Sequence, residues 1–95
     1  MPLFAVIRTR GPGWRHGTPM EEQDAWRAHA DFMNALVDDG FVLLGGPLDG
    51  PDVLLIVRAE GAGAIGVRLA ADPWEPNLLR TIRIAPWTLR LGRLP

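Results

Sequence analysis

The chain has 95 residues, and 47% of them are apolar, which fits a single folded domain over residues 1–95. Its formal net charge is −1, so bulk electrostatics does not attract it to nucleic acid or to an anionic membrane. It contains no cysteine, which excludes disulfides, thiolate nucleophiles and thiolate metal sites.

Residues 3–9 (LFAVIRT) are rich in β-forming side chains and predict the first strand. This short apolar run has no basic leader, so its pattern is not that of a signal peptide. No apolar run approaches the roughly 18–20 residues that a bilayer span needs. We therefore expect a cytoplasmic protein without a membrane partner.

Residues 10–19 (RGPGWRHGTP) contain three glycines and two prolines and predict a loop. An arginine fork suits a carboxylate, so the loop residues Arg10, Trp14, Arg15 and His16 are candidates to gate a pocket or to hold an anionic substrate. The alternative is a loop that is simply solvated.

A helix is predicted next, with Thr18 as its N-cap and Pro19 at its first position. Glu21 completes a Thr-x-x-Glu capping box, and Gly40 is the glycine that commonly follows a helix end. At about 100° per residue, one face of this helix gathers mainly apolar side chains. Its members are Glu22, Ala25, Trp26, His29, Phe32, Met33 and Leu36.

Two further strands are predicted at residues 41–48 and 52–59, and the DGPD sequence between them is typical of a hairpin turn. Gly45, Gly46 and Pro47 near the end of the first of these strands have two interpretations. Glycines there permit a ligand to approach the backbone, or they mark a β-bulge, and the bulge is the interpretation we favour.

Residues 60–73 predict a second helix, which three glycines weaken and which Pro73 ends, so that Asp72 becomes the first extended residue. Residues 77–89 predict the last strand, where Pro86 favours an edge position or a bulge. The resulting β-α-β-β-α-β order favours a ferredoxin-like α+β sandwich with an antiparallel sheet and both helices on one face.

Two of the predicted strands are apolar on both faces, since LFAVI and VLLIV do not alternate with polar residues. Two helices cover only one face of a four-stranded sheet. We therefore expect a homodimer in which the second faces of two sheets meet and close a shared barrel-like core.

His29 has two interpretations. A histidine on an apolar helix face is either a core residue whose ring nitrogens are hydrogen-bonded, or a catalyst. The catalytic interpretation needs a carboxylate that fixes the tautomer and favours the imidazolium, and it also needs a pocket. Asp72 is the best candidate for that carboxylate. The alternative is that Asp72 only begins a turn before Pro73.

Together, the segments RAHADFMNALVDDGFVLLGGPL, ADPW and RIAPWTL resemble the YCII-related family of the dimeric α/β barrel superfamily over roughly residues 3–90. The resemblance implies small ferredoxin-like homodimers with a histidine/aspartate-centred site, which falls on His29 and Asp72. One related member is a dehydrochlorinase, and the relatives include muconolactone isomerases. The loop at residues 10–18 and the glycine-rich second helix depart from the family pattern.

These observations predict a small cofactor-free enzyme in which His29 transfers a proton and Asp72 orients it, for an isomerisation or an elimination on a small organic molecule. The two histidines form no recognised metal-ligand spacing, so no metal is expected. The expected substrate-binding residues are Arg10, Trp14, Trp26, Met33, Gly46 and Trp74. Two alternatives are a non-catalytic ligand-binding or accessory module and a haem- or oxygen-using barrel with His29 as the axial ligand.

Overall fold

The computed structural model describes residues 1–94 as an α+β domain in which four strands and two α-helices follow one another in the predicted order. A short 3₁₀ helix, η1, lies between the first strand and the first α-helix. The elements are β1 (Leu3–Arg10), η1 (Met20–Glu22), α1 (Trp26–Asp38), β2 (Val42–Pro47), β3 (Val53–Arg58), α2 (Ala62–Ala70) and β4 (Leu79–Trp87).

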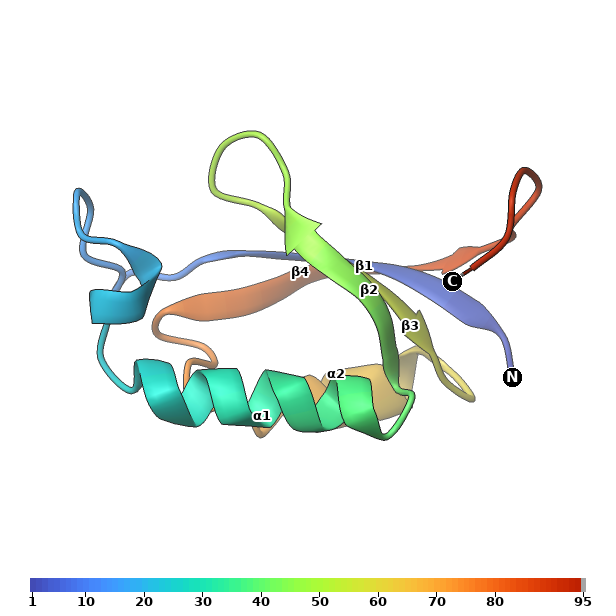
Figure 1. The fold of residues 1–95 in the computed structure, drawn as a ribbon, viewed down its shortest axis with the longest axis horizontal. Coiled ribbons are helices and arrows are strands. Elements are labelled where there is room, and N and C mark those ends of the chain that lie inside the picture. Colours follow the sequence, from blue (N-terminus) through green and yellow to red (C-terminus); the bar gives the residue numbers. More distant parts are fainter. Residues whose placement is uncertain (95) are drawn as a thin grey trace.

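The four strands form one open antiparallel sheet in the order β2-β3-β1-β4. Both helices lie on the same side of this sheet (Figure 1). This arrangement is compatible with the ferredoxin-like fold that the sequence predicts. Pro86 lies in β4, an edge strand, which is where a proline without an N–H can be tolerated.

The core fills the space between the helices and the sheet. Successive side chains of a strand point to opposite faces, so Phe4, Val6 and Arg8 of β1 share the face that the helices cover. Phe4 and Val6 join the main cluster of buried apolar side chains, whereas Arg8 is a buried charge beside it. The other buried members of that cluster are Leu36, Phe41, Val42, Leu55, Val57, Ala59, Ile65 and Leu69.

The opposite face of the sheet has an apolar middle, which is bordered by Arg58 of β3 and by Arg80 and Arg83 of β4. A row of aligned positions crosses it from Leu44 through Ile56 and Ala5 to Ala85. Leu44 is 43% exposed at the edge of this row, and neither α-helix lies on this side of the sheet (Figure 1). The prediction that the LFAVI and VLLIV segments are apolar on both faces is thus confirmed.

The predicted start of the first helix is wrong. Thr18, Pro19 and Glu21 do not form a capping box, and α1 begins only at Trp26, after Ala25 with a left-handed φ of 58°. Tertiary hydrogen bonds explain the difference. The buried side chain of Gln23 accepts a hydrogen bond from the Arg15 N–H and donates to the carbonyl oxygens of Arg15 and Thr18, each over 3.0 Å.

The predicted end of this helix is confirmed. Gly40 follows the helix with a φ of 83°, in the left-handed region that favours glycine. Its N–H donates to the carbonyl of Val37, and the Phe41 N–H donates to that of Leu36. Those two bonds make a Schellman motif, which satisfies carbonyl groups that the helix end leaves unpaired.

The bulge predicted at Gly45 and Gly46 lies elsewhere. The register of β2 against β3 shifts between Val42 and Leu44, so Leu43 is the extra residue. A Cβ added to Gly45 would lie 2.7 Å from Cδ2 of Leu55, whereas one added to Gly46 would meet nothing within 4 Å. Close packing against β3 therefore explains the glycine at position 45.

Candidate active site

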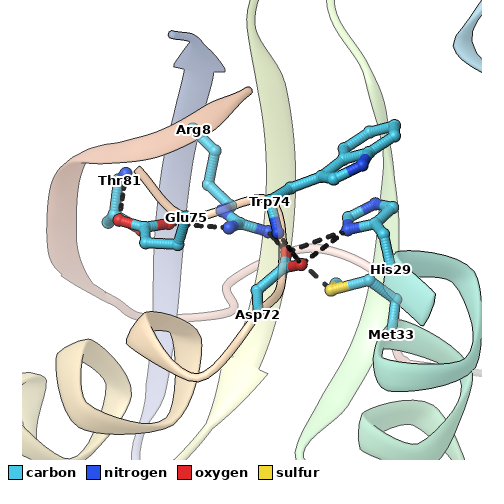
Figure 2. A network of polar contacts seen from close by, with 7 residues as sticks. All are labelled: Arg8, His29, Met33, Asp72, Trp74, Glu75 and Thr81. Atoms are coloured by element: carbon cyan, nitrogen blue, oxygen red, sulfur yellow. Dashed lines mark hydrogen bonds and ion pairs between the residues drawn. The ribbon is translucent and has the colours of Figure 1, made fainter. Parts of the chain in front are cut away.

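His29 and Asp72 are in direct contact, although they are 43 residues apart in the sequence (Figure 2). His29 lies on the buried side of α1, and Asp72 follows the end of α2. The Nδ1 atom of His29 is 2.9 Å from both carboxylate oxygens of Asp72. Both residues are buried, with exposures of 8% and 2%. The distance is within the range that the catalytic interpretation requires.

The turn after α2 fixes the Asp72 carboxylate. The Asp72 N–H donates to the carbonyl of Leu69 over 3.1 Å, which ties this residue to the last turn of the helix. Its Oδ1 atom accepts a hydrogen bond from the Trp74 N–H over 2.9 Å. A local side-chain-to-backbone bond of this kind is typical of aspartate in turns. Asp72 is therefore held by the backbone on both sides before it reaches His29.

Arg8 is a member of this site that the sequence analysis missed. Its side chain is 1% exposed, and Nη1 lies 2.9 Å from Oδ2 of Asp72 while Nη2 lies 2.8 Å from Oε2 of Glu75. The signal for it was present in β1. An arginine two residues after Val6 and four after Phe4 lies on the same strand face and is directed into the core, where a charge needs carboxylate partners.

Glu75 completes a line of polar contacts that runs from Glu75 through Arg8 and Asp72 to His29 (Figure 2). The Glu75 side chain is 16% exposed, and its Oε1 atom accepts a longer hydrogen bond from the Thr81 N–H over 3.4 Å. Because Glu75 shares the positive charge of Arg8, Arg8 does not fully neutralise Asp72. The Asp72 carboxylate can therefore bind both Arg8 and His29.

Trp74 sets the orientation of the His29 ring. The two rings stack with centroids 3.8 Å apart and planes within 6° of each other. Trp74 is itself held, because its Nε1–H donates to the carbonyl of Asp24 over 2.6 Å. With Nδ1 occupied by Asp72 and one ring face covered by Trp74, Nε2 is the remaining polar atom of His29. Within residues 1–94, Nε2 has no hydrogen-bond partner.

The pKa of Asp72 is lowered below its usual value of 3.8. Burial by itself raises this pKa, but the hydrogen bonds from His29 and the Trp74 N–H, with the charges of His29 and Arg8, outweigh burial. Asp72 is therefore ionised at neutral pH. An ionised carboxylate on Nδ1 favours the tautomer that carries its proton on Nδ1 and stabilises the imidazolium when Nε2 takes a second proton.

A cavity of about 470 Å³ lies beside His29, between α1, the sheet and the loops at residues 14–20 and 50–52. Arg8 and His29 line it. Five of the six residues expected to bind substrate line it as well, namely Arg10, Trp14, Met33, Gly46 and Trp74. Its size falls within the range of small-molecule sites, about 300–1,000 Å³.

Trp26 is the sixth expected substrate-binding residue, and it does not line the cavity. It occupies the first turn of α1 and packs on Trp74, with ring centroids 5.8 Å apart. This contact belongs to a second apolar cluster built on Trp74, Leu78 and Leu79. Trp26 therefore supports the residue that stacks on His29 rather than forming a wall of the cavity.

Residues 1–94 contain no group of three or more histidine, cysteine, aspartate or glutamate side chains placed to hold a metal ion. In the same part of the chain, no helix has the length and apolar character that a membrane span requires.

No protein-family model matches the sequence, and no curated protein matches it. The family assignment therefore stays a prediction from the residues quoted above.

Proposed function

We propose that this protein is a small enzyme of the YCII-related family in which His29 transfers a proton within a small organic substrate. One observation carries the proposal. Nδ1 of His29 is held by both oxygens of a buried, ionised Asp72, while His29 also lines a cavity of small-molecule size. A histidine that was only a hydrogen-bonded core residue would not need a cavity beside it.

The reaction begins with neutral His29, whose Nδ1–H donates to Asp72 and whose Nε2 carries a lone pair. Nε2 takes a proton from a carbon next to a carbonyl or enol, and the C–H electron pair moves into the substrate. In an isomerisation, the imidazolium returns the proton to another atom of the conjugated system. In an elimination, the electron pair forms a C=C bond and the leaving group departs with its bonding electrons.

We propose a homodimer as the assembly, with the two uncovered sheet faces packed against each other to close a barrel. The apolar row from Leu44 to Ala85 supports this arrangement, since large exposed apolar patches usually mark interaction sites. Light scattering should give twice the chain mass of 10.4 kDa. Leu44→Glu should shift the protein towards monomer, and a wild type that is monomeric at micromolar concentration would contradict the proposal.

A second candidate function is a non-catalytic binding module. The mainly apolar walls of the cavity favour it, because they suit retention of a ligand whether or not His29 reacts with it.

Rates on a panel of enol-lactones and halogenated enols, measured on wild type and on His29→Leu, separate the two candidates. Loss of a general acid/base lowers a rate by about 10²–10⁴-fold. His16→Leu is the matched control, because His16 is exposed in the loop after β1 and, contrary to one expectation from the sequence, does not line the cavity. Equal rates in folded wild type and His29→Leu would remove His29 from the mechanism. An inactive wild type on a broad panel would favour the binding module.

A further inference from the structure

We propose that the cavity binds a small organic carboxylate, with the carboxylate paired to Arg10 and an apolar body lying between Arg10 and His29. This inference deepens the proposed function, since the bound acid is the molecule on which His29 would act. It depends on the charge and contacts of Arg10, a residue that takes no part in the proposed proton transfer.

Two arginines of β1 reach the same cavity and differ in their partners. Arg8 and Arg10 are two residues apart and therefore point to the same face of the sheet, about 7 Å from one another along the strand. The charge of Arg8 is already paired, because Asp72 and Glu75 bind its two Nη atoms. Arg10 has no carboxylate within ion-pair distance among residues 1–94. Its charge is therefore free to bind an anion in the cavity.

Aromatic contacts hold Arg10 in place relative to His29. The Arg10 guanidinium lies 4.7 Å from the centre of the Trp14 ring, a cation–π distance. The edge of Trp14 meets Trp74 with ring centroids 5.5 Å apart, and Trp74 stacks on His29. A continuous line of contacts thus connects the free cation to the proton-transfer residue. Arg10 is otherwise exposed, and because Trp14 restricts its side chain, a ligand loses less side-chain entropy when it binds.

The rest of the cavity wall indicates the body of the ligand. The apolar residues that line the cavity near α1 and the sheet are Met33, Val37, Val42, Pro47, Val53, Leu55 and Leu79. Asp52 is the acidic side chain in this lining, and within residues 1–94 no arginine lies within ion-pair distance of it. A molecule with one carboxylate and an apolar ring satisfies Arg10 and the apolar wall together. A neutral analogue leaves the Arg10 charge unpaired.

Benzoate and its neutral isostere benzamide are suitable probes, titrated into the full chain and followed by tryptophan fluorescence and by NMR. We expect benzoate to bind with a dissociation constant of about 1 mM, which is typical for a ligand of this size. Benzamide should bind at least about tenfold more weakly. Arg10→Gln should weaken benzoate binding by about 10- to 100-fold, and Arg10→Lys should recover part of the loss. Arg90→Gln is the control, because Arg90 is exposed outside the cavity.

Asp52→Asn supplies a test of opposite sign. Removing this negative charge from the cavity lining should strengthen benzoate binding and leave benzamide binding unchanged. Higher salt should weaken benzoate binding in wild type more than in Arg10→Gln, since screening acts on the charge pair.

Three results would overturn the inference: no benzoate binding up to about 20 mM, equal affinity for benzoate and benzamide, or an unchanged benzoate affinity in folded Arg10→Gln. The proposed function fails separately. Arg10-dependent benzoate binding without turnover of any panel member would contradict only proton transfer. Turnover that needs His29 but not Arg10 would contradict only the carboxylate site.

Discussion

Replacing Arg8 by methionine removes the cation that joins two carboxylates in the core. We expect Arg8→Met to lower the free energy of unfolding at pH 7 by about 3–5 kcal/mol, the usual cost of breaking a buried ion pair. The Asp72 side chain is fully buried beside Arg8, whereas that of Glu75 is 16% exposed and remains partly hydrated. Most of the loss should therefore come from the stranded charge of Asp72. Methionine keeps an unbranched apolar stem, so cavity formation adds little.

The size of this loss depends on pH, and the lowered pKa of Asp72 gives the direction. A carboxyl with a lower pKa in the folded protein contributes stability that is complete above its unfolded value of 3.8. That stability is lost as the pH falls through the folded pKa. Arg8 is one of the groups that lower this pKa. Wild type and Arg8→Met should therefore differ most near neutral pH and converge as the pH falls below about 4.

Urea unfolding followed by tryptophan fluorescence measures this loss, because Trp74 is buried and reports on the same site. The protein concentration must be the same for all variants. Arg90→Met is the control for loss of an arginine from an exposed position. The double variant Arg8→Met/Asp72→Asn should lose less than the sum of the two single variants, because it leaves no buried charge at Asp72. A loss below about 1 kcal/mol at pH 7, or one that is the same at pH 7 and at low pH, would refute the reasoning.

Four further predictions concern stability and local opening. Trp74→Ala should cost about 3–5 kcal/mol in urea unfolding, because it empties a fully packed site; a cost near that of an exposed substitution would contradict the packing. Gly63→Ala in α2 should raise the free energy of unfolding by about 1 kcal/mol, since the new Cβ meets nothing within 4 Å. Gly11→Ala should lower the melting temperature, because its Cβ would lie 2.3 Å from the carbonyl oxygen of Asn77. Gln23→Ala should speed amide hydrogen exchange in the segment at residues 15–23, whose backbone Gln23 holds, and unchanged exchange would refute that role.

Local sequence patterns were sufficient for most of the fold. The strands follow from their β-forming composition, and the hairpin follows from the DGPD turn between β2 and β3. The end of α1 at Gly40 follows from the preference of glycine for positive φ. The apolar stripe of α1 correctly predicted that His29 lies on the buried side of the helix. Each of these features depends on residues that are close in the chain, so a short stretch of sequence contains the relevant information.

Tertiary structure decided the rest. Asp72 was a candidate partner from its position before Pro73, but its contact with His29 depends on how α2 packs relative to α1. The start of α1 was wrong because Gln23 holds the preceding segment through contacts that its own propensity does not predict. Arg8 became part of the site only when folding brought two carboxylates to it from the turn after α2. Interactions between distant segments can outweigh local preferences because a buried charge or polar group must find its partner wherever the fold provides one.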